Sequence, residues 1–92
     1  MRALKRMRRA IREERYRIST HANEEMSVDG LVAADIEQII LTGRITRRFT
    51  RDPRGTRYEV AGNATDDREA CVVCRFLQSG VLLIVTAYEA EE

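Results

Sequence analysis

The only histidine of the chain, His21, lies in the stretch Ile18 to Met26, where a predicted strand runs into a predicted helix. An imidazole has an ordinary pKa of about 6.5, so His21 is suited to act as a general acid or base at neutral pH. Glu24 and Glu25 follow on the next helical turn, but one imidazole with these carboxylates makes a poor metal site, and we predict no bound metal. The alternative is a structural role, in which the ring packs at the helix start and bonds a backbone group.

Arginine is the second residue type that could do chemistry, because 15 of the 16 basic residues are Arg. A guanidinium group binds a phosphate through two parallel hydrogen bonds, which a Lys ammonium does not. Residues 1–17 hold eight basic and two acidic residues. A second arginine-rich stretch comprises Arg44, Arg47, Arg48, Arg51, Arg54 and Arg57. These stretches favour a nucleic acid or an acidic protein as partner, and the alternative is a solvated helix face with an arginine-rich sheet edge.

Cys71 and Cys74 match the C-x-x-C spacing of zinc and redox sites, but they fall within a predicted strand. Residues three apart on a strand point to opposite faces and lie about 10 Å apart, whereas a disulfide needs Cα atoms within about 7 Å. We therefore predict buried structural thiols and no cofactor.

Residues 2–15 are predicted to form a basic amphipathic helix. Its apolar residues recur at spacings of three and four and give a single narrow stripe, made of Leu4, Met7 and Ile11. A stripe this narrow predicts weak docking, either onto the rest of the domain or onto a partner.

A short strand and two helices are predicted next. Residues 16–19 alternate as a strand, and Ser19 or Thr20 caps the helix that starts at His21 and is broken by residues 27–30. Residues 31–41 give the clearest helix of the chain. Its polar residues Asp35, Glu37 and Gln38 are expected to face outward, and Gly43 is its C-cap signal.

After Gly43 the pattern changes to the period of two that is typical of strands. Four strands are predicted, at residues 45–50, 56–61, 70–77 and 81–88. The fourth is apolar on both faces, so we expect it to be central in the sheet or covered by helices. The predicted fold class is α+β, with two helices packed on a four-stranded antiparallel sheet. Residues 1–15 form the basic helix, and residues 16–92 form one domain.

The totals limit the class of protein. A chain of 92 residues has room for one modest core. No apolar run approaches the roughly 20 residues that span a bilayer, and no apolar signal core follows the basic N-terminus. We therefore expect a cytoplasmic protein that does not interact with a membrane.

Several short motifs resemble a bacterial family of domains of unknown function that opens with a Ser-x-His-Ala box. The matching residues are Ser19-x-His21-Ala22, Met26, Gly30-Leu31, the helix Asp35 to Ile40, Arg57-Tyr58-x-Val60-x-Gly62, Val72-Val73 and Ile84 to Tyr88. The resemblance covers residues 16–88 and leaves the basic helix outside. That family is similar to BrnT-like toxins and, more distantly, to the RelE/ParE toxin superfamily, so the resemblance implies a RelE-like fold.

The resemblance also implies an activity, that of a type II toxin which cleaves mRNA as a metal-independent endoribonuclease. In that reaction a ribose 2′-OH attacks the adjacent phosphate, which requires cations and a proton acceptor and donor. The motif match implies His21 and Arg57 as catalytic residues, and we add Arg68 and Tyr88 as candidates. The candidates for binding RNA are Arg44, Arg47, Arg48 and Arg51.

The resemblance implies an antitoxin of the zinc-finger type as partner, besides RNA or the ribosome. The predicted sheet also leaves an edge strand open, which allows pairing with a second copy as a homodimer. The alternative function is a non-catalytic module of the same fold that binds protein or nucleic acid. The two functions differ in whether bound RNA is turned over.

Overall fold

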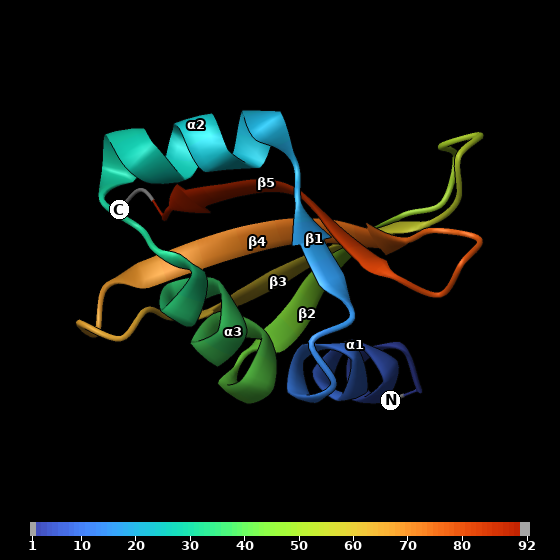
Figure 1. Cartoon of the computed structure of the whole chain (residues 1–92), viewed down its shortest axis with the longest axis horizontal. Coiled ribbons are helices and arrows are strands. Elements are labelled where there is room, and N and C mark those ends of the chain that lie inside the picture. Colours follow the sequence, from blue (N-terminus) through green and yellow to red (C-terminus); the bar gives the residue numbers. More distant parts are fainter. Residues whose placement is uncertain (1, 91–92) are drawn as a thin grey trace.

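The computed structural model describes residues 2–90, which form three helices and five strands (Figure 1). The helices are α1 (Arg2–Arg12), α2 (Thr20–Asp29) and α3 (Ala33–Thr42). The strands are β1 (Tyr16–Ile18), β2 (Arg44–Phe49), β3 (Arg57–Asn63), β4 (Glu69–Phe76) and β5 (Leu82–Glu89). The α+β class is confirmed. The predicted β-strand positions agree with these bounds to within about two residues.

The sheet differs from the prediction in having five strands, in the order β1-β5-β4-β3-β2. The prediction of four antiparallel strands is wrong, because the short strand β1 joins the sheet and runs parallel to β5. Its residues Tyr16 and Ile18 pair with Leu82 and Ile84, more than 60 positions further along the chain. Such a pairing has no local turn signal, so the sequence pattern could not reveal it.

Beyond Ile18, helix α2 takes over from β1 along the edge of β5. The carboxylate of Glu25 accepts a hydrogen bond from the backbone N–H of Ala87, at 3.2 Å. One turn later, Asp29 accepts one from the N–H of Glu89, at 2.9 Å. These side chains accept from backbone N–H groups of β5 that lie beyond the end of β1 and would otherwise have no strand partner. Figure 1 shows α2 lying along this edge of β5.

Both ends of α2 have the residues that its geometry requires. The side chain of Ser19 accepts a hydrogen bond from the N–H of Ala22, so the predicted cap is confirmed. The helix runs to Asp29 and so includes residues 27–29, where the sequence predicted a break. It ends at Gly30, whose φ of 68° is the left-handed conformation that favours glycine.

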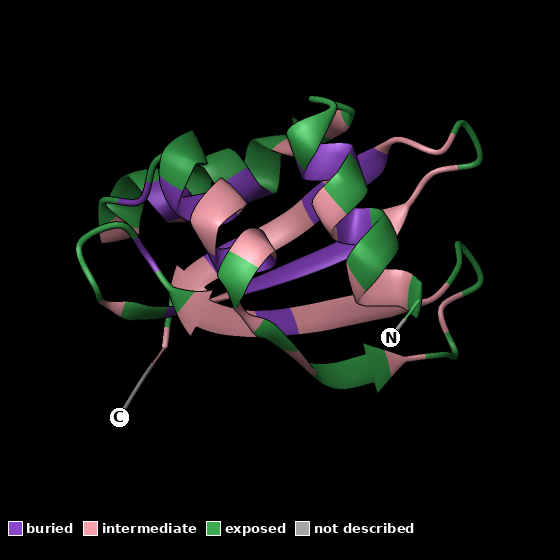
Figure 2. Cartoon of the chain, turned by 90° about the horizontal axis from the view of Figure 1, so that it is seen from below, coloured by how far each residue is buried: buried purple, intermediate pink, exposed green. Residues whose placement is uncertain are grey.

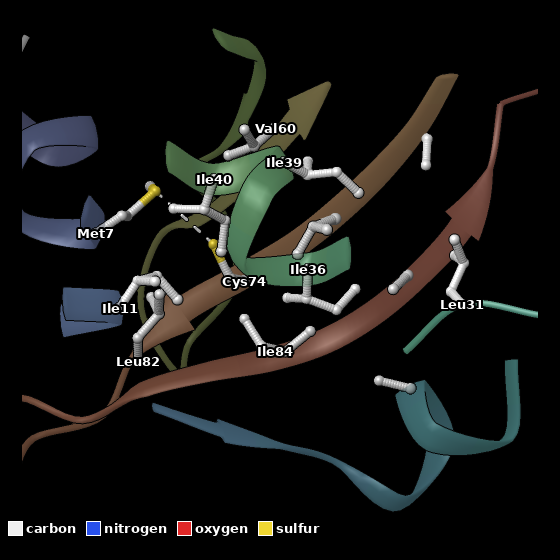
Figure 3. Close-up of a cluster of buried hydrophobic side chains, with 14 of the residues drawn as sticks. Met7, Ile11, Leu31, Ile36, Ile39, Ile40, Val60, Cys74, Leu82 and Ile84 are labelled. Carbon is white, nitrogen blue, oxygen red and sulfur yellow. Dashed lines mark hydrogen bonds between the residues drawn. The ribbon is translucent and has the colours of Figure 1, made fainter. Parts of the chain in front are cut away.

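Helix α1 is an integral part of the core, so the prediction of weak docking is wrong. Met7 has no exposed surface and Ile11 is 4% exposed. The Cys74 thiol points at the Met7 sulfur, 3.9 Å away (Figure 3). The Arg8 side chain also donates to the carbonyls of Ile40 and Gly43 at the end of α3, at 3.1 and 2.9 Å. These bonds use carbonyls that a helix terminus leaves without partners.

The three helices lie on one side of the sheet, and the other side carries no helix (Figure 2). The buried apolar residues of β3, β4 and β5 point toward the helices and form the core with them; they include Val60, Val72, Cys74, Leu82 and Ile84. We call the opposite side of the sheet, which none of the elements formed by residues 2–90 covers, the open face. Side chains that alternate with the core residues along the strands occupy it.

Asp35 does not face outward as predicted, but is only 3% exposed. It occupies the third position of α3, where its carboxylate reaches back and accepts from the N–H of Val32, at 2.8 Å. It also accepts from the N–H and the hydroxyl of Thr65 in the β3–β4 loop, at 2.8 and 2.6 Å. Burial raises the pKa of Asp35, but these hydrogen bonds and the Arg68 charge outweigh burial, so its pKa lies below the usual 3.8.

We therefore expect Asp35→Asn to lower the free energy of unfolding by about 1–3 kcal/mol at pH 7, because the amide cannot accept all three hydrogen bonds. A carboxylate whose pKa is depressed by folding stabilises the fold above its unfolded pKa and loses that effect as the pH falls through its folded pKa. The difference between wild type and variant should therefore shrink below about pH 4. Urea unfolding across pH measures it. The exposed Glu24→Gln serves as control, and equal stability of Asp35→Asn and wild type at pH 7 would contradict the assignment.

Candidate nucleic-acid interface

The strand register places four residues, one from each of four strands and all but Val73 polar, in one row across the open face. Arg47 on β2 is opposite Glu59 on β3, which is opposite Val73 on β4, which is opposite Thr86 on β5. A bulge at Thr46 puts Arg47 in the position opposite Glu59, and the Thr46 hydroxyl also reaches the Glu59 carboxylate. The row thus brings a guanidinium group and a carboxylate together at its β2 end.

An arginine and aromatic cluster lies next to this row. The guanidinium carbons of Arg47 and Arg57 lie 4.9 and 5.1 Å from the centre of the Phe49 ring. The Nε of Arg57 lies 3.1 Å from a carboxylate oxygen of Asp52, but at an angle that leaves this buried nitrogen without an aligned hydrogen bond. Guanidinium groups held against an aromatic ring can bind phosphates while the ring stacks on a base.

Glu59 and Tyr88 form the centre of the open face. The Tyr88 hydroxyl donates to one carboxylate oxygen of Glu59, at 2.9 Å, and the Thr46 hydroxyl donates to the other, at 2.8 Å. Burial raises the pKa of Tyr88 well above 10, and the hydrogen bond to Glu59 and the neighbouring Cys71 raise it further. Tyr88 is therefore a protonated donor beside a carboxylate acceptor.

His21 lies at the other margin of the sheet, beyond β5. Its side chain is 67% exposed, and its Nε2 lies 3.3 Å from a carboxylate oxygen of Glu25. Because the same carboxylate accepts from the Thr86 hydroxyl, His21 stands at the β5 end of the row that begins with Arg47. Three strand spacings, about 14 Å, separate β5 from β2. The structural alternative for His21, a ring packed and bonded to the backbone, does not fit this exposure.

Arg68 is held away from the row by four partners. It bonds the carboxylates of Asp66 and Glu89, at 2.7 and 3.3 Å, and the carbonyls of Asp29 and Gly30, at 2.6 and 3.1 Å. These bonds connect the β3–β4 loop to the end of α2. The donors of Arg68 are thus occupied in maintaining the fold, and the structure does not bring it together with Arg57, Tyr88 or His21.

The remaining arginine candidates are divided between surfaces. Arg44 lies on the open face opposite Ala61, whereas Arg48 pairs with Tyr58 and points to the helix side. Arg51 lies exposed in the β2–β3 loop. The open face also has a cation that the sequence analysis did not select, because Arg75 follows Cys74 and so continues the register opposite Arg57.

The two cysteines are free and point to opposite faces, as their spacing predicts. Cys74 is buried in the core, and burial raises the pKa of its thiol to about 12. Cys71 is half-buried on the open face beside Tyr88, so the prediction that both thiols are buried is wrong for Cys71. Within residues 2–90, no cluster of three or more His, Cys, Asp or Glu side chains is placed to bind a metal ion. None of the described helices has both the length and the apolar character needed to cross a membrane.

Sequence reasoning missed Glu59 and Thr46. Alternation along β3 places Arg57 and Glu59 on one face of the strand, and Tyr58 and Val60 on the other. An acid on the same face as several arginines was a usable signal. The hydrogen bond between Glu59 and Tyr88 could not be predicted from the sequence, because it depends on how β3, β4 and β5 pair.

Comparison with known protein families finds one family that matches most of the chain. The model of the family described as "Domain of unknown function (DUF4258)" matches residues 18–89. These include His21, the whole of the row and every helix and strand except α1 and the start of β1. The match confirms the expected domain-of-unknown-function family. No curated protein and no solved structure has significant similarity to the chain.

The contact between Tyr88 and Glu59 predicts how the phenol titrates. The Tyr88 hydroxyl should remain protonated above pH 10, and Glu59→Gln should lower its pKa by removing the acceptor charge. Carbon NMR of labelled tyrosine rings from about pH 9 to 12 measures this. Tyr16 is an internal control, because its pKa is raised to about 12 by burial and Glu37, and Glu59→Gln should leave it unchanged. Titration of Tyr88 at its ordinary pKa in the wild type would refute the contact.

Proposed function

The chain belongs to the DUF4258 family, and we propose that it is a toxin-type, metal-independent endoribonuclease that binds single-stranded mRNA on its open face. The observation that carries this proposal is that Arg47, Phe49 and Arg57 lie directly beside the Glu59–Tyr88 pair. Cations, a stacking ring, a proton acceptor and a proton donor are thereby gathered on one uncovered surface. The resemblance of the Ser-x-His-Ala box to BrnT-like and RelE/ParE toxins supports the same activity.

The binding step follows from the chemistry of the cluster. Single-stranded RNA exposes both its phosphates and its bases, so it can pair with guanidinium groups and stack on an aromatic ring at the same time. The guanidinium carbons of Arg47 and Arg57 lie 4.9 and 5.1 Å from the centre of the Phe49 ring, so two cations and the part of the ring that they leave exposed can contact the same nucleotide. In a double helix the bases are stacked inside, so its phosphates could contact the arginines but its bases could not stack on Phe49.

The cleavage step requires one proton to leave the 2′-hydroxyl and one to reach the departing 5′-oxygen. In the proposed mechanism, the Glu59 carboxylate accepts the first proton as the 2′-oxygen bonds to phosphorus. Tyr88 donates the second as the bond from phosphorus to the 5′-oxygen breaks. The proton on Glu59 then returns to Tyr88 through their hydrogen bond. The products are a 2′,3′-cyclic phosphate and a 5′-hydroxyl, and Arg47 and Arg57 stabilise the charge that develops on the phosphate.

His21 is assigned to the neighbouring nucleotide. Its exposed ring stands at the β5 margin, about 14 Å across the strands from β2, so an RNA strand that lies along the row passes it one or two nucleotides away from Arg47. A protonated imidazole there would bind a flanking phosphate. On this proposal His21 acts mainly in binding, whereas Glu59 and Tyr88 act on the reacting bonds.

The partner follows from the same surface. An antitoxin that neutralises the activity would have to cover the open face, and acidic residues would complement Arg44, Arg47, Arg57 and Arg75. The exposed edge of β2 also offers unpaired backbone groups to which a partner strand could add. We therefore propose that the antitoxin binds across β2 and the open face.

The test is incubation of the purified chain with labelled mRNA in excess EDTA. We expect cleavage that leaves 2′,3′-cyclic phosphate ends. We expect Glu59→Gln and Tyr88→Phe each to lower the single-turnover rate about 100-fold or more, because general acid or base catalysis contributes about that much. His21→Ala should weaken RNA binding with a smaller effect on the saturated rate.

The control is Arg12→Ala, which removes an exposed cation on α1, on the helix side of the sheet. Its rate should equal that of the wild type. Intact RNA with and without ribosomes, together with normal growth on induction, would refute the nuclease. Salt-sensitive RNA binding without cleavage would instead identify the non-catalytic binding module.

A further inference from the structure

A groove outside the open face gathers a second set of arginines. It lies between α1 and the β4–β5 hairpin, encloses about 270 Å³, and is lined by Arg6, Arg9, Glu13, Arg15, Phe76 and Gly80. Ligand pockets usually exceed about 300 Å³, so this space suits a phosphate with its sugar rather than a large cofactor. None of the activity proposed above uses these residues.

The charge of the groove favours an anion. Glu13 lies 3.1 Å from Arg9 and 3.7 Å from Arg15, whereas Arg6 has no carboxylate partner among residues 2–90. Three guanidinium groups therefore share one carboxylate, which leaves a net charge of +2. The Arg6 guanidinium lies 4.1 Å above the centre of the Phe76 ring, which holds its plane and leaves its N–H donors free at the rim.

The groove is also held in shape by the fold. Met7 and Ala10 are buried, which fixes the rotation of α1 and turns Arg6 and Arg9 toward the hairpin. On the other wall Gly80 has a φ of 89°, and a Cβ atom there would come within 3.3 Å of the Arg15 guanidinium. The positive φ favours glycine at this turn, and the absence of a Cβ leaves room there for the Arg15 guanidinium.

The position of the groove relates it to the open face. Arg75 and Phe76 are neighbours on β4, so their side chains point to opposite faces of the sheet. Arg75 lies on the open face beside Arg57, and Phe76 forms the floor of the groove under Arg6. A strand of RNA that leaves the open face past Arg75 therefore needs only to pass the end of β4 to reach the groove.

We propose that this groove is a phosphate-binding site that holds one phosphate of the RNA strand whose other nucleotides lie on the open face. The choice of RNA rests on the proposed function, whereas the phosphate chemistry rests on the groove itself. Bidentate guanidinium groups around a space of this size fit a phosphate better than an acidic peptide, whose carboxylates would have to enter one at a time.

The test measures binding of a 2′-O-methyl RNA of roughly 12 nucleotides, which cannot be cleaved by 2′-OH attack, over a range of salt concentrations. We expect Arg6→Gln/Arg9→Gln to reduce the slope of log K against log salt by about 0.7, the value for one phosphate contact of a single strand. The matched control is Lys5→Gln/Arg12→Gln, which removes the same charge from exposed positions of α1 outside the groove. Its slope should change less than that of the groove variant. Equal slopes for the wild type and the groove variant would refute the site and leave the proposed function standing.

A second experiment tests the phosphate site without RNA. Titration with inorganic phosphate should shift the amide NMR signal of Gly80 saturably in the wild type and not in Arg6→Gln/Arg9→Gln. A shift at Gly80 without RNA binding would refute the proposed function and support the phosphate site. No shift with phosphate, or a shift with a polyglutamate peptide alone, would refute the phosphate site. Comparing the affinities of 5′-phosphorylated and 5′-hydroxyl RNA shows which phosphate of the strand occupies the groove. Phosphorylation increases the affinity if the groove holds the terminal phosphate and leaves it unchanged if the groove holds an internal one.

Discussion

The fold depends on how the backbone groups along the edge of β5 that faces away from β4 find hydrogen-bond partners. β5 lies inside the sheet and pairs with β4 on one side, so the backbone groups on its other side also need partners. Three residues of β1 satisfy the first part of that edge, and the carboxylates of Glu25 and Asp29 on α2 satisfy the N–H groups further along. The strand-to-helix junction at Ser19 is thus where one kind of partner replaces the other, and it fixes His21 at the margin of the sheet.

The open face is the consequence of this arrangement. α2 is needed at the β5 edge, while α1 and α3 cover the core, and α1 is fixed there by buried Met7 and by the bonds of Arg8 to α3. No described element covers the other side of the sheet (Figure 2). Its polar row can therefore contact a ligand without any rearrangement of the fold. The candidate chemistry lies there because alternation along each strand separates core residues from Arg47, Glu59 and Tyr88.

Local pattern was sufficient for most elements, since periodicity and the cap residues Ser19 and Gly30 predicted where helices and strands occur. It failed where distant segments meet. The parallel pairing of β1, the burial of Asp35 against Thr65, and the bond between Glu59 and Tyr88 each join residues at least 29 positions apart. The same limit applied to Arg68, because its bonds to Asp29, Gly30 and Glu89 connect the β3–β4 loop to the ends of α2 and β5, at least 21 positions away.

RNA is proposed to bind the open face rather than the outer surfaces of α2 and α3. Amide and arginine side-chain NMR signals recorded during titration with uncleavable 2′-O-methyl RNA test it most directly. The account predicts the largest shifts at Arg47, Phe49, Arg57 and Tyr88, with smaller ones at His21. Shifts confined to exposed positions of α2 and α3, such as Val28 and Val32, or no shifts at saturating RNA, would contradict it.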